Sequence, residues 1–203
     1  MGATRWVSAV TRAIDVLNER VARCSFWLVL ILTLETAISA IVLKVFDIGS
    51  NAFIEIRWYL FSAIFLFGSG YTLQKNAHVR IDVIAGRFSR RAQAIIDIFG
   101  TLAFLFPLAI LVIWMSWGVF VDSYMSGEMS SSAGGLILWP ARLMLPLGFG
   151  LLLLQGFAEI LKRLLFLCGA GPDPLATGDK PSAEEQLADE IRRAQQNGKE
   201  GVL

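Results

Sequence analysis

The fold of this chain is decided by Gly70-Tyr71-Thr72-Leu73-Gln74-Lys75-Asn76-Ala77-His78-Val79-Arg80-Ile81-Asp82, a charged stretch that separates two long apolar runs. It contains the only histidine and opens the most basic segment of the chain, which continues through Arg87, Arg90 and Arg91. A basic connection between apolar segments is typical of a loop that fixes the orientation of a membrane protein.

Composition points to the membrane. Of the 203 residues, 55% are hydrophobic and only 17% are charged, whereas soluble domains usually carry about 25% charged residues. The net charge of +1 gives no indication of a nucleic-acid partner. Four apolar runs are long enough to cross a hydrocarbon core about 30 Å thick. We therefore expect an all-α integral membrane protein whose four spans are residues 26–45, 57–73, 95–121 and 137–166.

Two further segments lie outside the expected spans. From Thr4 to Cys24 the apolar residues recur at helical spacing, which predicts an amphipathic helix lying in the membrane surface or packed on a partner subunit. Its apolar face is predicted to contain Val7, Val10, Ile14, Leu17, Val21 and Leu28, and its outer, polar side Arg5, Arg12, Asp15, Asn18, Glu19 and Arg23. At the other end, residues 169–203 begin with a Gly- and Pro-rich cluster and continue as a polar sequence. We expect a membrane domain over residues 1–168 and a short soluble tail over 169–203.

The basic residues are unevenly distributed among the connections. They gather before the first span, after the second and at the end of the fourth, at Arg5, Arg12, Arg20, Arg23, Lys75, Arg80, Arg87, Arg90, Arg91, Lys162 and Arg163. Because positive residues mark cytoplasmic connections, both termini and the 74–93 loop are expected in the cytoplasm. Within the third span, Pro107 is expected to kink the helix, and Ser89 to cap its start.

Ionisable residues within the spans are candidates for function. Glu35 lies near the middle of the first span, where an unpaired charge is costly. It is either a coupling carboxylate or a buried hydrogen-bonding residue at a helix contact, and the second interpretation is favoured. In the fourth span, Gly148, Leu152, Gln155 and Glu159 fall on one helical face, which we expect to be buried against protein in this chain or in another.

The sequence offers no arrangement typical of an enzyme. A single histidine cannot supply a metal cluster, and a Ser/His/Asp triad would have to use His78 on the basic loop. We expect no enzyme, and no metal or cofactor bound by this chain. Four spans without an inverted repeat favour an accessory membrane subunit over a complete carrier.

Several motifs resemble one family in their order and spacing. They are Glu55-x-Arg57-Trp58-Tyr59-Leu60, Gly70-Tyr71-Thr72-Leu73, His78-Val79-Arg80-Ile81-Asp82, Glu128-Met129-Ser130, Gly134-Gly135-Leu136, Pro146-Leu147-Gly148-Phe149 and Leu152-Leu153-Leu154-Gln155-Gly156. Across roughly residues 20–165 the chain resembles the DctQ type of small membrane subunit of tripartite ATP-independent periplasmic (TRAP) transporters.

The resemblance implies a bacterial inner-membrane subunit that pairs with a large membrane subunit. In this family the large subunit carries the sodium and substrate sites, and a periplasmic solute-binding protein delivers an organic acid. The small subunit would be a static scaffold in the lipid bilayer. Residues expected at the subunit interface or in structural roles are Glu35, Glu55, Arg57, His78, Arg80, Asp82, Glu128, Gly148, Gln155 and Glu159.

Two alternatives remain open. One is a stand-alone small carrier or channel in which Glu35 couples transport. The other is a membrane enzyme or assembly factor that uses His78. For the charged loop, the simpler expectation is that His78, Arg80 and Asp82 cap and pair the ends of the second and third helices.

Overall fold

The structure, a computed structural model, describes residues 2–75 and 89–171, and every long element in these ranges is helical. Three helical segments follow one another without a break and form the third candidate span, which gives four helices long and apolar enough to cross a membrane. The elements are α1 (Gly2–Phe46), α2 (Asn51–Gln74), α4 (Arg90–Gly100), η1 (Thr101–Leu105), α5 (Phe106–Ser126) and α6 (Trp139–Leu167). The all-α class and the expected number of four long apolar helices are confirmed.

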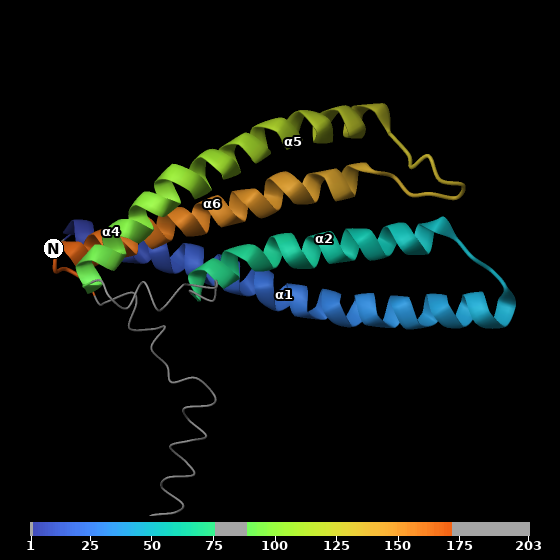
Figure 1. Ribbon diagram of the computed structural model, residues 1–203, viewed down its shortest axis with the longest axis horizontal. Coiled ribbons are helices and arrows are strands. Elements are labelled where there is room, and N and C mark those ends of the chain that lie inside the picture. Colours follow the sequence, from blue (N-terminus) through green and yellow to red (C-terminus); the bar gives the residue numbers. More distant parts are fainter. Residues whose placement is uncertain (1, 76–88, 172–203) are drawn as a thin grey trace, which may run out of the picture.

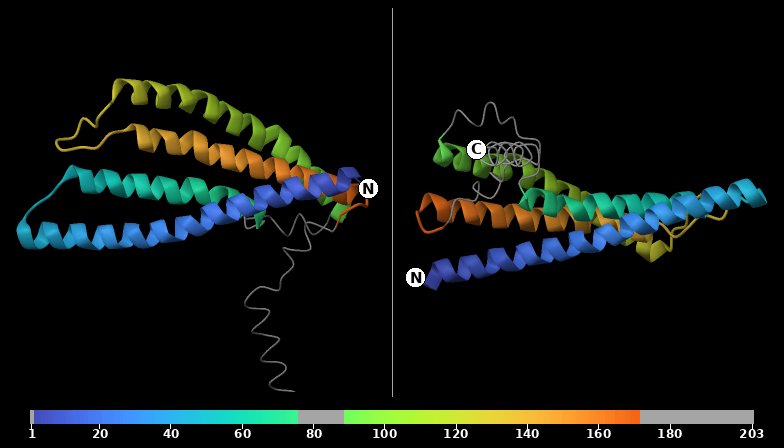
Figure 2. Two further views of the ribbon diagram at one scale, coloured as in Figure 1. Left: turned by 180° about the vertical axis from the view of Figure 1, so that it is seen from behind. Right: turned by 90° about the horizontal axis from the view of Figure 1, so that it is seen from below.

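Helix α6 lies between the other helices. In Figure 1, α5, α6, α2 and α1 follow one another side by side, and the first half of α1 crosses to lie along α6. The left view of Figure 2, seen from behind, shows the same order. The short α1–α2 connection and the α5–α6 loop lie at one end of the molecule, and the start of α1 and the end of α6 at the other.

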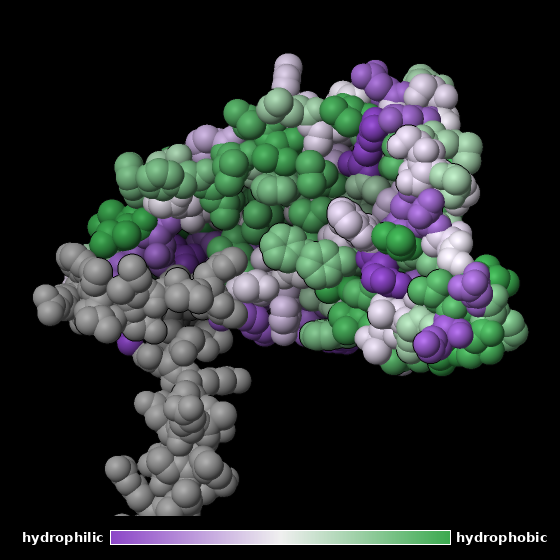
Figure 3. Space-filling model, turned by 45° about the vertical axis from the view of Figure 1, so that its right-hand side comes forward, coloured by the Kyte–Doolittle hydropathy of each residue, from purple (hydrophilic) through white to green (hydrophobic). Residues whose placement is uncertain are grey.

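Small residues allow the helices to approach closely. The buried apolar residues are Ala22, Ala63, Leu66, Ala94, Ala109 and Ala158, all but one of them alanine. Large apolar side chains instead point outward on every span, and they form a hydrophobic band between more hydrophilic ends (Figure 3). This pattern is typical of helices packed in lipid, where close backbone contact rather than a large apolar core holds them together.

The third span is bent where the proline was expected to act. Pro107 lacks an N–H group, and the turn before it, η1, is a π-helix in which the Phe106 N–H donates to the Thr101 carbonyl. A single π-turn of this kind changes the direction of a helix. Figure 1 shows the resulting curve from α4 into α5.

The start of the chain corrects the expected separate amphipathic helix. Residues 2–46 form one continuous helix, so the N-terminal segment is the extension of the first span. Its packed side includes Thr11, Asn18 and Ala22, which are buried, while Leu17 is 43% exposed. The predicted apolar face was therefore partly wrong: polar Asn18, assigned to the outer side, turns inward because it finds a hydrogen-bond partner on α6.

The helix ends follow local signals. Ser50 accepts a hydrogen bond from the Ala52 N–H at the start of α2, and Ser89 accepts one from the Ala92 N–H at the start of α4, which confirms the expected cap. Gly127 ends α5 in the left-handed conformation, with φ of 62°. The expectations for most of the 74–93 loop and for the C-terminal tail fall on residues 76–88 and 172–203, outside the described ranges.

Candidate functional site

Glu35 and Arg57 form an ion pair between the first two helices. Nε of Arg57 lies 3.2 Å from Oε2 of Glu35, and its Nη2 donates to the Ser39 hydroxyl at 2.7 Å. The Glu35 side chain is only 11% exposed, whereas that of Arg57 is 36% exposed. The pair joins α1 to α2.

The position of this pair is unusual for an arginine near a helix end. At about 1.5 Å per residue, Arg57 lies about 9 Å from the start of α2, and Glu35 about 16 Å from the end of α1. Arginines near a membrane surface usually extend toward the headgroups. Here the guanidinium turns toward the interior, because Glu35 and Ser39 accept its hydrogen bonds there.

Glu55 holds the α5–α6 loop against the start of α2. Its carboxylate accepts hydrogen bonds from the Leu136 N–H at 2.6 Å and from the Ser130 hydroxyl. Two residues at helical spacing from it continue the contact: the Asn51 side chain donates to the Ala133 carbonyl and the Tyr59 hydroxyl to the Ile137 carbonyl. Three successive turns of α2 therefore bind one loop.

The loop is closed by a second ion pair. Glu128 lies just after α5 and Arg142 in the first turns of α6, and Nη2 of Arg142 donates to Oε1 of Glu128 at 2.6 Å. Beside them, Tyr124 and Trp139 meet edge to face with ring centroids 5.6 Å apart. Aromatic rings at this level suit a membrane–water boundary.

A buried polar cluster joins the helices at the opposite end. Gln155 lies at its centre: it accepts a hydrogen bond from Asn18 at 2.9 Å and donates one to Asp15 at 2.9 Å. Lys162 bridges Asp15 and Glu159 with distances of 2.7 and 2.8 Å. Two segments of the chain that are far apart in sequence, α1 and α6, meet here.

Arg163 extends the cluster to α4. Its side chain, 4% exposed, pairs with Glu159 at 2.7 Å and with Asp97 at 3.1 Å. Buried charges are tolerated when they are paired and hydrogen-bonded, and removing one member leaves its partners uncompensated. These contacts connect α6 to α1 and to α4 and make the cluster a structural brace, with every formal charge in it engaged by an opposite one.

Glycines allow the helices to meet beside the cluster. A Cβ built at Gly70 would lie 2.3 Å from Oδ1 of Asn18, and one at Gly148 would lie 2.5 Å from Cβ of Leu66. Both distances are shorter than side chains tolerate. Gly70 and Gly148 are therefore required for the contacts of α2 with α1 and α6.

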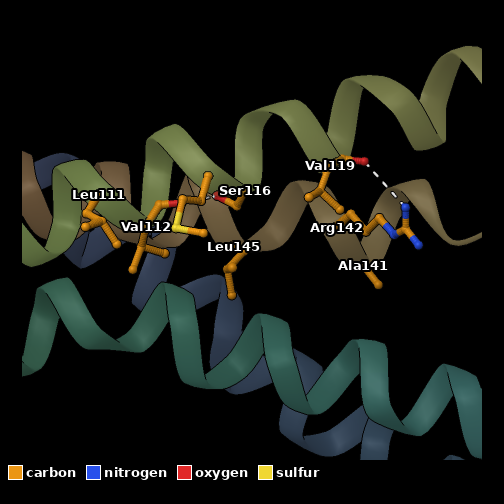
Figure 4. Close-up of a pocket in the computed structure, with 8 residues that line it drawn as sticks. Leu111, Val112, Ser116, Val119, Ala141, Arg142 and Leu145 are labelled. Carbon is orange, nitrogen blue, oxygen red and sulfur yellow. Dashed lines mark hydrogen bonds between the residues drawn. The ribbon is translucent and has the colours of Figure 1, made fainter.

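An open groove of about 520 Å³ runs between α5 and α6 (Figure 4). Apart from Ser116 and Arg142, its lining is apolar: Leu111, Val112, Met115, Val119, Ala141 and Leu145. The Ser116 hydroxyl already donates to the Val112 carbonyl, and Arg142 binds Glu128. Because these polar groups are engaged, the groove suits an apolar occupant and not a charged solute.

In the structure, seven of the expected site residues lie in three separate regions. Glu35 with Arg57 lies between α1 and α2, Glu55 and Glu128 lie at the loop, and Gly148, Gln155 and Glu159 lie on the packed side of α6. The remaining three, His78, Arg80 and Asp82, belong to residues 76–88 and lie outside the described part. Within the described residues, no group of three or more His, Cys, Asp or Glu side chains could hold a metal ion.

Sequence reasoning missed most of the buried cluster and predicted only Gln155 and Glu159. Asp15 and Asn18 were assigned to the outer side of the N-terminal helix, and Lys162 and Arg163 were used only as topology signals. Their spacing did contain a signal, since Glu159 lies four residues after Gln155 on α6, and Lys162 and Arg163 lie three and four residues after Glu159. That stripe predicts polar partners on the facing helices.

Comparison with known proteins gives one match. The family model described as "Tripartite ATP-independent periplasmic transporters, DctQ component" matches residues 32–166. The match begins within α1 and ends at the last turn of α6, so it covers the last part of the first span and the other three spans. No curated protein and no solved structure matches the chain.

Proposed function

Since the chain belongs to the DctQ family, the small membrane component of TRAP transporters, we propose that it is the static scaffold subunit of a sodium-driven, binding-protein-dependent uptake system. Its family is one of transporter membrane subunits, not of enzymes. Its partners are a large membrane subunit, which carries the sodium and substrate sites, and a periplasmic solute-binding protein, which delivers an organic acid.

The observation that carries this proposal is the large exposed apolar surface of the spans. Only six apolar residues among those described are buried, whereas exposed large side chains occur on every span. A helix layer of this kind, with α6 at its centre, leaves broad faces that a larger membrane protein can cover. Lipid covers whatever the partner leaves free.

The polar clusters support a static role. Each joins helices of this chain: α1 to α2 through Glu35 and Arg57, α2 to the α5–α6 loop through Glu55, and α1, α4 and α6 through the buried cluster. Cross-links at both ends of the molecule oppose relative movement of the helices. A coupling role for Glu35 alone is disfavoured, because Arg57 already neutralises it.

The proposal includes an orientation in the bacterial inner membrane. Both termini and the 74–93 connection face the cytoplasm by the distribution of basic residues. The α1–α2 connection and the loop held by Glu55 then face the periplasm, the side from which a solute-binding protein delivers its cargo. The first half of α1 lies near the cytoplasmic surface, where its exposed arginines meet lipid headgroups. The membrane domain is residues 1–168, with 169–203 as a cytoplasmic tail.

Co-expression with the large membrane subunit of the same transporter tests the proposal. An affinity tag on this chain should recover the large subunit in a stable, stoichiometric complex after solubilisation in mild detergent. An unrelated four-span protein carrying the same tag serves as the control. Recovery of this chain only as a stable monomer, with the large subunit folded in the same membranes, would contradict the proposal.

A further inference from the structure

One face of α1 changes from basic to apolar part-way along the helix. Its first part carries exposed arginines at spacings of seven, eight and three residues: Arg5, Arg12, Arg20 and Arg23. The same face continues at spacings of three or four with apolar side chains that are at least 49% exposed: Trp27, Leu30, Leu34, Ile38, Ile41 and Val45. Because α1 is one unbroken helix, these residues form one continuous outer surface.

This surface lies opposite the packed face of α1. Asn18 and Ala22 are buried, and each lies two residues from Arg20, about 200° away around the helix. Arg20 therefore points away from α6, the helix that Asn18 binds. Within residues 2–75 and 89–171 Arg20 has no ion pair, and Arg23 has only its exposed pair with Glu19. The positive charge of this turn is open to an occupant from outside the chain.

The length of the apolar part agrees with the thickness of a bilayer. From Trp27 to Phe46, the end of α1, the helix rises about 30 Å, which is also the thickness of the hydrocarbon core. Trp27 and its neighbour Phe26 are 68% and 67% exposed, and exposed aromatic side chains are enriched at the membrane boundary. Arg23 and Arg20 lie about 6 and 10 Å beyond Trp27, which brings their side chains to the headgroups.

Charge complementarity identifies the occupant. Between residues 12 and 23 this face carries three arginines and one exposed carboxylate, that of Glu19. In the proposed orientation this end of α1 meets the cytoplasmic leaflet, whose anionic lipids give it a negative surface. An acidic protein segment would match the arginines, but a phospholipid also matches the apolar surface that continues directly from Trp27.

We propose that the turn of α1 containing Arg20 and Arg23 binds the phosphate group of anionic phospholipids in the cytoplasmic leaflet. Their acyl chains lie along Trp27 and the apolar residues that follow it on the same face. The inference rests on the proposed function for its orientation, and it adds the class of lipid and the residues that select it. Zwitterionic phospholipids carry the same phosphate, but their ammonium group offsets its charge, so they bind more weakly.

Lipid binding by the purified full-length chain tests the site. The chain in detergent is titrated with phosphatidylglycerol, or with phosphatidylcholine of the same acyl chains, and bound lipid is counted by native mass spectrometry. We expect phosphatidylglycerol to bind about tenfold more tightly. Arg20→Gln should lower the affinity for phosphatidylglycerol about fivefold and leave that for phosphatidylcholine unchanged. Arg5→Gln removes the same charge about 22 Å further along the same face, so it is the matched control and should change neither affinity.

Two results with the chain alone would overturn the lipid site. They are equal affinities of the wild-type chain for the two lipids, and a loss with Arg5→Gln as large as that with Arg20→Gln. The same titration is then made on the complex with the large subunit. Loss of the preference for phosphatidylglycerol there would show that the partner covers this face, and would overturn the assignment as well.

The proposed function is tested separately. Arg20→Gln should recover the large subunit as the wild-type chain does, because the lipid-facing turn takes no part in assembly. If the wild-type chain recovers no large subunit, the scaffold assignment fails, whereas the lipid preference of the chain alone is measured without the partner. A retained preference for phosphatidylglycerol in the complex, reduced by Arg20→Gln and not by Arg5→Gln, supports the lipid site.

Discussion

Gly70 lies at the narrowest contact between α1 and α2, where a Cβ would meet Oδ1 of Asn18 at 2.3 Å and the Leu151 carbonyl oxygen at 3.5 Å. Neither neighbour can move freely, because Asn18 is held by Gln155 and Leu151 belongs to the α6 backbone. The position tolerates only a glycine. Close approach of this kind replaces the large apolar core of a soluble bundle.

We predict that Gly70→Ala destabilises the protein by about 1 to 3 kcal/mol through overpacking. The matched control is Gly68→Ala on the same helix, where a Cβ has nothing within 4 Å. Thermal unfolding midpoints in detergent provide the measurement. Equal midpoints for the two variants would show that the contact between α1 and α2 is looser than described.

Glu159 is the residue on which the buried cluster depends most. It pairs with both Lys162 and Arg163 and is 2% exposed. We predict that Glu159→Gln costs about 2 kcal/mol or more, since the buried Arg163 and the partly buried Lys162 lose a carboxylate partner. Arg163 keeps Asp97 and Lys162 keeps Asp15, which limits the loss.

The exposed pair of Glu19 with Arg23 supplies the control. Its side chains are 45% and 72% exposed, so Glu19→Gln should change stability by less than about 0.5 kcal/mol. Unfolding midpoints of the two variants are compared in the same detergent. A Glu159→Gln protein as stable as the Glu19→Gln protein would contradict the structural role of the cluster.

At the scale of elements, the start of α2 and the α5–α6 loop form one unit. Glu55 accepts the Leu136 N–H and the Ser130 hydroxyl, and Gly135 fits beside Ser130 because it has no Cβ. The loop also has backbone hydrogen bonds of its own, from the Ser130 N–H to the Leu136 carbonyl and from the Leu138 N–H to the Glu128 carbonyl, so the contacts with Glu55 hold it against α2. Their removal should release the loop without unfolding the spans.

We predict that Glu55→Gln speeds hydrogen exchange at the Leu136 amide by about tenfold, because a charged acceptor is replaced by a neutral one. Amides within α5 should exchange as before. Met129→Ala, at an exposed loop position, is the control and should leave Leu136 unchanged. Unaltered protection of Leu136 in the Glu55→Gln protein would mean that the loop is held by other contacts.

The number and order of the spans could be predicted from the sequence, but the side of α1 that packs against the other helices could not. Apolar length and charged connections locate a span independently of its neighbours, which is why all four were found. The packed face of α1 is instead set by Gln155 on α6, which accepts a hydrogen bond from Asn18 and donates one to Asp15. In lipid, the apolar side of a helix can face the acyl chains and its polar side can pack against other helices. The apolar periodicity of α1 alone therefore predicted a packed face that is partly wrong.

The interaction partners of the candidate residues could not be predicted from one sequence either. Glu35 was expected at a helix contact, yet Arg57, its ion-pair partner in this chain, was assigned to the edge of the second span. The long Arg57 side chain extends toward Glu35, and the position of Arg57 in the sequence does not show in which direction its side chain extends. Gln155 and Glu159 were expected on a buried face, because a small and polar stripe in a span is costly against lipid.

At the scale of the whole molecule, the proposed orientation gives opposite accessibility for two described positions. With Cys24 and Cys168 replaced by Ser, a single cysteine at Ser131 in the α5–α6 loop should react with a membrane-impermeant maleimide applied from the periplasmic side. A cysteine at Arg91, at the start of α4, should react only after the membrane is permeabilised. The reverse pattern would invert the proposed topology.

The central claim is that this chain supports transport by assembly and takes no part in ion coupling. Glu35→Gln tests it most directly when the complete transporter is reconstituted in proteoliposomes and uptake is measured per assembled complex. We predict fewer or less stable complexes, because the pair with Arg57 is weakened, but unchanged uptake and unchanged sodium dependence for each complex that forms. Normal assembly with uptake abolished would contradict the account and make Glu35 a coupling carboxylate.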